Sequence, residues 1–168
     1  MPIILPVKGV HPIIDETVFV ADNATIVGNV VIGSHASVWF NAVVRGDVNF
    51  IRIGDYTNIQ DGVTIHCTYQ KNGTNIGSYV NIGHQAIVHG CTIEDYSLIG
   101  MGAIVMDRAV VETNVIIAAG AVVLENTRCE SGYLYAGVPA KKIKALTEDQ
   151  LALLKQLPHN YVLYSSWF

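Results

Sequence analysis

The chain has 168 residues, of which 51% are hydrophobic and 14% charged, and its formal net charge is −4. This length suffices for one domain with its own core, and no apolar run approaches the roughly 18 residues of a membrane-spanning helix. The net negative charge argues against nucleic acid as a partner, because phosphate binding depends on clustered Lys and Arg. The low charged fraction suggests that another subunit covers part of the surface.

The first ten residues, MPIILPVKGV, lack the basic start, long apolar block and small-residue cleavage site of a signal peptide. We therefore expect a cytoplasmic protein. Its three cysteines, Cys67, Cys91 and Cys129, are scattered and odd in number. This pattern favours small buried hydrophobic side chains over a disulfide framework.

Val or Ile recurs every six residues through the region from about 14 to 128, with two interruptions. A period of six fits neither the 3.6-residue helix nor an alternating strand, but it fits short strands that are joined by turns. Three such units close one triangular coil, and stacked coils bury the repeated anchor residues. The sequence therefore predicts an all-β fold, a parallel β-helix of hexapeptide repeats. The anchors are Val20, Ile26, Ile32, Val38, Val44, Ile53, Ile59, Ile65, Ile76, Ile82, Val88, Ile93, Ile99, Val105, Val111, Ile117 and Val123.

The repeat stops after Val123, and residues 129–146 are expected to form an exit segment with turns. Thr147 and Gln150 then have the spacing of a helix capping box. We expect one helix from there to about Leu157, where Pro158 ends it and begins a second helix. This C-terminal helical segment, residues 147–168, is expected to pack along the coils or on a neighbouring subunit.

Two histidines fall in register when the hexapeptides are assigned in turn to three faces. Val44, Ile65 and Val88 then share one face of successive coils, called face two here. The residue after each anchor points outward, so Arg45, His66 and His89 should form a column. Neighbouring strands lie about 4.8 Å apart, so two imidazoles in this column can share one metal ion. Insertions around VNFIR and within HCTYQKNGTN are expected to bulge from a corner and to preserve the register.

A third histidine, His84, belongs to the preceding face, called face one, and lies near a corner. Within its own subunit it should not reach His66 and His89. A threefold trimer resolves this, because face two of one subunit would meet the face-one corner of the next. Three histidines within 24 residues favour this interpretation over ordinary surface residues. We interpret His11, His35 and His159 as ordinary surface residues.

Several motifs stand out together: RGD at Arg45 to Asp47, NIQDG at Asn58 to Gly62, His66, IGHQAIVHGC and IGMGAIVMD. This set resembles the γ-class carbonic anhydrase-like proteins, and the resemblance covers nearly the whole chain. It implies a left-handed β-helix and a homotrimer with metal sites at the subunit interfaces. It also implies the metal ligands His66, His84 and His89. Zn²⁺ is the expected ion, and the same imidazoles are compatible with Fe²⁺ or Co²⁺.

The resemblance also implies roles for residues around the metal. Arg45 and Asp47 match an ion pair at the subunit interface. Gln60 matches a residue that hydrogen-bonds the metal-bound solvent, and Asp61 matches a supporting carboxylate. Tyr161 or Asn160 matches a polar group near the site. The register separately puts Gln60 and Asp61 on face one, one coil before His84, where a carboxylate would support a ligating imidazole. The alternatives are a structural ion pair for the charged residues, a surface amide for Gln60 and core packing for Tyr161.

The resemblance implies metal-dependent reversible hydration of CO₂ to bicarbonate, with Gln60 orienting the attacking solvent. Two departures from the most active type of the family predict a slow enzyme. Val48 stands where that type has a glutamate, and the loop CTYQKNG lacks the carboxylate that would carry protons.

Two alternatives belong to other classes of function. A hexapeptide acyltransferase shares the coil and often uses a histidine as general base. Three converging histidines exceed what a single base requires. A metal-binding trimer with little catalysis, serving as an assembly module or as a metal or siderophore carrier, is favoured by the missing carboxylates.

Overall fold

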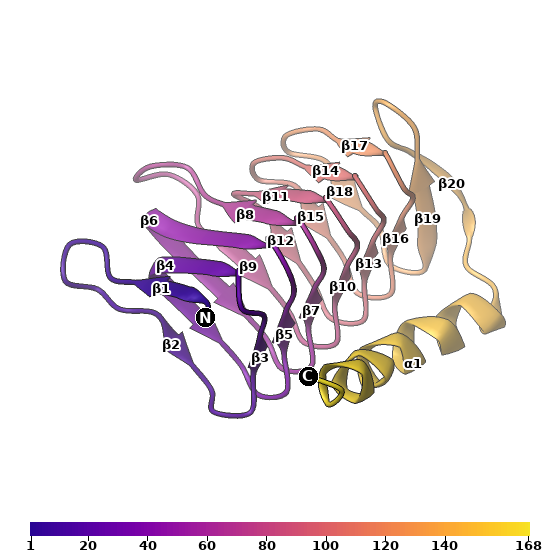
Figure 1. Cartoon of the computed structure of the whole chain (residues 1–168). Helices are drawn as coiled ribbons and strands as arrows, with labels where there is room; N and C mark the ends of the chain where they lie inside the picture. Colours follow the sequence, from indigo (N-terminus) through magenta and orange to yellow (C-terminus); the bar gives the residue numbers. More distant parts are fainter.

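The computed structural model describes all 168 residues and is a left-handed parallel β-helix of about seven coils with one C-terminal helix (Figure 1). This confirms the predicted fold class. Each full coil contributes one short strand to each of three faces. No helix has both the length and the apolar character needed to span a membrane.

Face one is a sheet of eight strands. Its first seven members pair in parallel with the strand one coil away, and the eighth closes the sheet as the antiparallel partner of the seventh. The strands are β3 (Phe19–Val20), β5 (Ser37–Val38), β7 (Asn58–Ile59), β10 (Asn81–Ile82), β13 (Leu98–Ile99), β16 (Ile116–Ile117), β19 (Tyr133–Ala136) and β20 (Lys141–Ala145).

Faces two and three form one sheet of 12 strands, because β4 (Thr25–Ile32) and β6 (Val43–Ile53) run around the corner between them. At this corner Gly28 has a φ of 78°, and a Cβ atom there would collide with the carbonyl oxygen of Gly46. Face two also holds β1 (Ile3–Leu5), β8 (Thr64–His66), β11 (Ile87–His89), β14 (Ile104–Val105) and β17 (Val122–Val123). Face three also holds β2 (Ile13–Ile14), β9 (Thr74–Ile76), β12 (Thr92–Ile93), β15 (Val110–Val111) and β18 (Arg128–Cys129).

The predicted anchors form the core. All of them are buried except Val20, which packs partly exposed against the first coils. The strand pairs place Val44, Ile65 and Val88 on one face, as the register predicted. All three cysteines are free and buried, which confirms their interpretation as small core residues.

The stack of coils extends beyond the expected limits of 14 and 128. At one end, β1 pairs in parallel with the start of β4. At the other end, β18 and β19 continue the coil through residues expected to form an irregular exit, and Tyr135 takes an anchor position opposite Ile117. The six-residue spacing misses both ends because neither keeps a Val or Ile at every step.

Several corner residues adopt left-handed backbone conformations that residues other than glycine rarely take. Tyr56, Tyr79 and Tyr96 all have φ between 55° and 59°. Their rings stack one coil apart, with centroids 4.9 and 4.8 Å apart and planes within 5° of parallel. Stacking of this kind offsets part of the cost of the left-handed backbone conformation.

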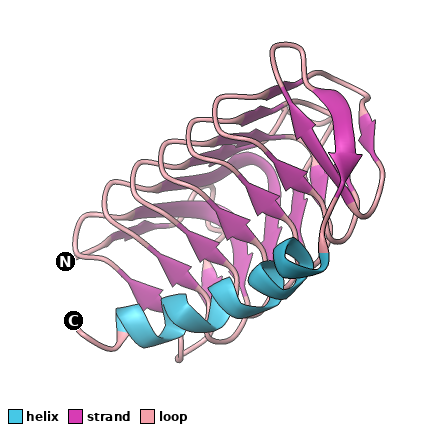
Figure 2. Ribbon diagram, turned by 90° about the vertical axis from the view of Figure 1, so that its right-hand side faces the viewer, coloured by secondary structure: helices cyan, strands magenta, loops and turns pink.

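One continuous helix, α1 (Glu148–Ser165), replaces the two predicted helices. The capping box of Thr147 and Gln150 begins it as predicted, but Pro158 lies inside the helix. Figure 2 shows the helix running across successive strands of face one, along the stack of coils, and Leu154 and Pro158 are buried against this face. This packing compensates for the hydrogen bond that a proline removes from a helix interior.

Candidate metal centre

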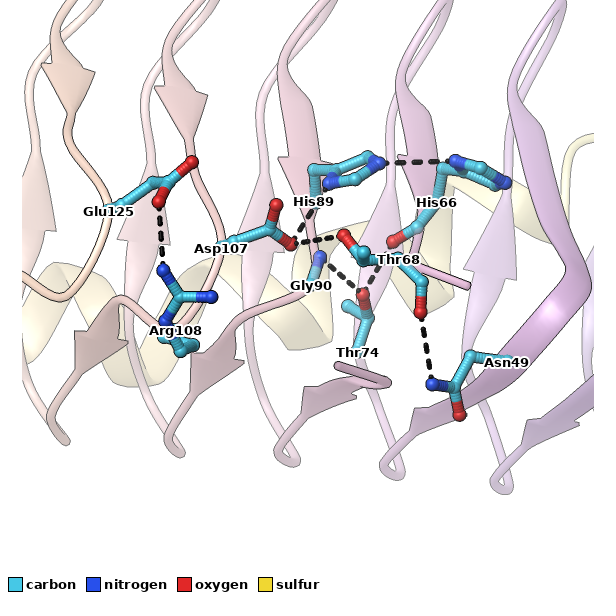
Figure 3. Close-up of polar contacts among 9 residues, drawn as sticks. All are labelled: Asn49, His66, Thr68, Thr74, His89, Gly90, Asp107, Arg108 and Glu125. Carbon is cyan, nitrogen blue, oxygen red and sulfur yellow. Dashed lines mark hydrogen bonds and ion pairs between the residues drawn. The ribbon is translucent and has the colours of Figure 1, made fainter. Parts of the chain in front are cut away.

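Two histidines on neighbouring coils face each other on face two. β8 and β11 pair with His66 opposite His89, which confirms the predicted column. Their ring centroids are 5.1 Å apart, and His66 Nδ1 lies 3.1 Å from His89 Nε2 (Figure 3). Arg45 lies one coil earlier, directly after Val44, the anchor that pairs with Ile65.

Each of these rings also meets a carboxylate through its other nitrogen. Asp47 Oδ1 lies 3.0 Å from His66 Nε2, and Asp107 Oδ1 lies 3.2 Å from His89 Nδ1. Arg45 Nη1 donates to Asp47 Oδ2 at 2.5 Å. Burial alone would raise the pKa of Asp47, but hydrogen bonds from His66 and Arg45 outweigh it and hold that pKa below its usual value. Asp47 is therefore an ionised acceptor at neutral pH.

The hydrogen-bond partners of the two rings suit a metal ion between them. Carboxylates only accept hydrogen bonds, so each neutral ring carries its proton on the nitrogen that faces its carboxylate. The inner nitrogens, His66 Nδ1 and His89 Nε2, then present two lone pairs to each other at 3.1 Å. Two lone pairs at this distance repel unless a cation lies between them or one ring gains a second proton. Zn–N distances of 2.0–2.1 Å in a tetrahedral site separate two ligand nitrogens by about 3.3 Å, close to this spacing.

A second group of predicted residues gathers on face one. His84 Nδ1 lies 2.9 Å from Asp61 Oδ2, which confirms that these two residues are neighbours on adjacent coils. His84 and Gln60 both line a pocket of about 400 Å³. The pocket walls are mainly apolar, including Met101 and Leu157. The carboxylate leaves His84 Nε2 available as a ligand, just as Nδ1 is available in His66 and Nε2 in His89.

Gln60 is one end of a buried chain of amides and not an exposed surface residue. Its Nε2 donates to Asn58 Oδ1 at 2.9 Å, and Asn58 Nδ2 donates to Asn81 Oδ1 at 2.6 Å. Gln60 is 8% exposed and lines the pocket. Because its amide nitrogen is committed to Asn58, its oxygen is the atom free to accept a hydrogen bond from a molecule in the pocket.

Tyr161 of α1 lines the same pocket as Gln60 and His84, whereas Asn160 does not. Burial, with a smaller contribution from the charge of Asp61, raises the pKa of Tyr161, so its hydroxyl stays protonated. The ring also packs edge-on against Trp39, with centroids 5.6 Å apart. The side chain thus takes part in packing and contributes to the pocket lining.

The predicted site residues form two separate groups in a single chain. Arg45, Asp47, His66 and His89 lie on face two, while Gln60, Asp61 and His84 lie on face one, where Tyr161 of α1 lines the same pocket as Gln60 and His84. No cluster of three or more His, Cys, Asp or Glu side chains within the chain is arranged to hold a metal ion. The structure therefore does not bring His84 to the other two histidines.

Asp107 is the residue of this neighbourhood that sequence reasoning missed. It lies in the MD pair of IGMGAIVMD, 17 residues after Gly90 and hence one coil beyond the HG pair. A glycine followed one coil later by aspartate also occurs at Gly77 and Asp95. That recurrence is the signal that would have identified it.

Comparisons with known proteins identify the family of the chain. A family model described as "Bacterial transferase hexapeptide (six repeats)" matches residues 90–125. The "Carbonic anhydrase" of Geobacillus kaustophilus is 40% identical over 159 residues, which are 95% of this chain and 87% of that protein. "Gamma carbonic anhydrase 2, mitochondrial" of Arabidopsis thaliana is 42% identical over 156 residues. Those residues are 90% of this chain, which spans only 56% of the plant protein.

Among solved structures, a hexapeptide transferase family protein from Anaplasma phagocytophilum is 42% identical and superposes with a TM-score of 0.95. The match covers 99% of this chain and 98% of the other. Identity of this level over almost entire chains extends to both the coils and the helix. The chain belongs to the γ-class carbonic anhydrase-like family of hexapeptide-repeat proteins.

Proposed function

We propose that this protein catalyses the reversible hydration of CO₂ to bicarbonate as a metal-dependent homotrimer. His66 and His89 of one subunit and the partner subunit's His84 would hold Zn²⁺, with Fe²⁺ or Co²⁺ as other ions that suit imidazole ligands. Each of three equivalent sites would then lie between two subunits.

The facing pair of imidazole nitrogens supports this proposal most directly. His66 Nδ1 and His89 Nε2 are 3.1 Å apart, and the outer nitrogen of each ring is held by a carboxylate. His84 has the same arrangement, with Asp61 on its Nδ1. Metal-ligating histidines commonly have a carboxylate on the second nitrogen, which fixes the ring and raises its basicity.

A bound zinc ion would supply the Lewis acidity that lets a water molecule ionise near neutral pH. The chain's own groups do the remaining work. Asp47, Asp61 and Asp107 keep one nitrogen of each ring unprotonated and directed at the ion. The oxygen of Gln60 accepts a hydrogen bond from the attacking solvent and orients its lone pair toward CO₂. The apolar walls of the pocket, with Met101 and Leu157, suit an uncharged linear substrate.

Proton transfer is expected to limit the rate. The loop from Thr68 to Gly73 contains no carboxylate, and Val48 is apolar. A proton released at the metal must therefore pass to buffer or to a group outside this loop. We expect turnover to rise with buffer concentration until a later step becomes limiting.

The test combines metal analysis with stopped-flow CO₂ hydration on anaerobically purified protein loaded with Zn²⁺ or Fe²⁺. The proposal predicts one metal ion per chain and a rate that increases with buffer. His84→Ala should abolish both metal and rate, whereas His11→Ala, the same change at a histidine outside the site, should alter neither. Protein that binds one ion per chain but leaves hydration at background in strong buffer contradicts the catalytic part.

An acyltransferase is the second candidate, because the similar Anaplasma phagocytophilum structure is named for the hexapeptide transferase family. Saturable binding of acetyl-CoA to metal-free protein would favour it. A metal-binding trimer without catalysis would bind the ion, show background hydration and fail to bind acetyl-CoA.

A further inference from the structure

Apart from His66, Asp107 is the one side chain that forms a hydrogen bond or ion pair with the His89 ring. Its Oδ1 lies 3.2 Å from His89 Nδ1 and accepts a hydrogen bond of 2.8 Å from Thr68 Oγ1 (Figure 3). Its side chain is 18% exposed, so solvent competes little for these contacts. One carboxylate oxygen thus joins a predicted metal ligand to the first residue of the inserted loop.

The backbone is shaped to admit this carboxylate. Gly90 follows His89 with a φ of 57°, and a Cβ atom at Gly90 would collide with Asp107 Oδ1. Gly77 and Asp95 have the same relation at another corner, but there the carboxylate accepts from the backbone N–H of Ser78 at 2.8 Å. Beside Gly90, the carboxylate of Asp107 instead contacts the side chains of His89 and Thr68.

The charge of Asp107 has no arginine partner. Asp47, which holds the other histidine, shares its charge with Arg45. Arg108, the residue next to Asp107, pairs instead with Glu125 at 2.9 Å (Figure 3). The negative charge of Asp107 therefore acts on His89 without an adjacent cation to offset it.

Building on the proposed function, we infer that Asp107 is a positioning residue for His89. It holds the imidazole as the tautomer with its proton on Nδ1, which leaves Nε2 directed at His66 and available to the metal. Through Thr68 it also ties the inserted loop to that ligand. Asn49 Nδ2, which donates to the Thr68 carbonyl at 3.1 Å, secures the loop from the preceding coil.

The test uses full-length protein and two readouts that do not depend on activity. The first is Zn²⁺ affinity, from competition with a chromogenic chelator. Asp107→Ala should weaken it roughly 10–100-fold, the usual cost of losing a carboxylate behind a ligating histidine. Asp95→Ala is the matched control, because it removes a corner carboxylate that faces a glycine but touches no histidine; it should leave Zn²⁺ affinity unchanged.

The second readout is the tautomer of His89, from long-range ¹H–¹⁵N correlation spectra of metal-free protein. Asp107→Ala should give a mixture of tautomers, and Asp107→Asn should also lose the strict preference for the Nδ1-protonated form, because an amide can donate to Nδ1 as well as accept from it. Thr68→Val removes only the loop contact and should keep the tautomer. A wild-type tautomer and Zn²⁺ affinity in Asp107→Ala, or an equal affinity loss in Asp95→Ala, overturns the inference.

These results separate the inference from the proposed function. Zinc binding that depends on Asp107 without CO₂ hydration supports the positioning role and contradicts the activity. If Asp107→Ala changes neither CO₂ hydration nor zinc binding, the proposed activity is supported and the positioning role is contradicted. Should wild-type protein bind no zinc, the metal proposal fails, and the tautomer spectra alone decide whether Asp107 positions His89.

Discussion

Replacing Ile65 with alanine should separate the contribution of the core from that of the metal ligands. Ile65 is fully buried between Val44 and Val88, and its chain neighbour His66 points outward. Losing three carbons costs about 2.4 kcal/mol at about 0.8 kcal/mol each. The strand ladders on both sides hold the walls apart, and a residual cavity of about 50 Å³ would add about 1.2 kcal/mol. We expect Ile65→Ala to lower the free energy of unfolding by about 3–4 kcal/mol, and Ile65→Val by about 0.5–1.5 kcal/mol.

The assay is urea unfolding at one fixed protein concentration, because stability of an oligomer depends on concentration. Zn²⁺ affinity of the folded variant should stay near that of wild type, since the backbone ladder that aligns His66 with His89 does not use this side chain. His66→Ala should show the opposite pattern, with little loss of stability and no metal binding. A loss below about 1 kcal/mol for Ile65→Ala, outside the usual range for buried isoleucine, would refute this reasoning.

Three further predictions concern other parts of the chain. A backbone hydrogen bond from Ser131 lowers the pKa of Glu112, so its stabilisation is present above the unfolded pKa and lost as pH falls through the lower folded value. Glu112→Gln should therefore match wild type in acid and be less stable near neutral pH, as measured by unfolding across that range. Thr147→Ala removes the helix cap and should cost about 1 kcal/mol in urea unfolding. Tyr79→Ala loses two stacked neighbours and should cost about 1–3 kcal/mol in the same assay, whereas the exposed Tyr69→Ala should change little.

The six-residue repeat predicted the coils and the register because one physical requirement recurs at every step. A β-branched anchor fills the space between stacked coils, so its spacing alone fixes which residues share a face. The outward neighbours then follow, which is why His66 and His89 were correctly placed together. The same register correctly placed Asp61 beside His84.

Features that depend on tertiary contacts were not predictable in this way. Pro158 was predicted to end a helix because proline removes a backbone hydrogen bond, but packing on face one keeps α1 continuous. The strand β1 lacks the repeat and is held by pairing with β4. Asp107 lies a full coil from His89 along the chain, and only the closed coil brings its carboxylate to the ring. Whether His84 completes the site lies beyond a single chain and stays a prediction.

Complementation between inactive subunits tests the shared site most directly. Co-expressed in equal amounts, His66→Ala and His84→Ala chains assemble at random, and a site is intact when the first chain supplies His84 and the second supplies His66 and His89. Random threefold assembly predicts zinc in about a quarter of the sites of the mixture, although each variant alone binds none. A mixture of His66→Ala with His89→Ala, whose lesions lie in the same half of the site, should recover no zinc. Zinc content that stays at background in the first mixture, or that rises equally in both, would contradict a metal centre built from two subunits.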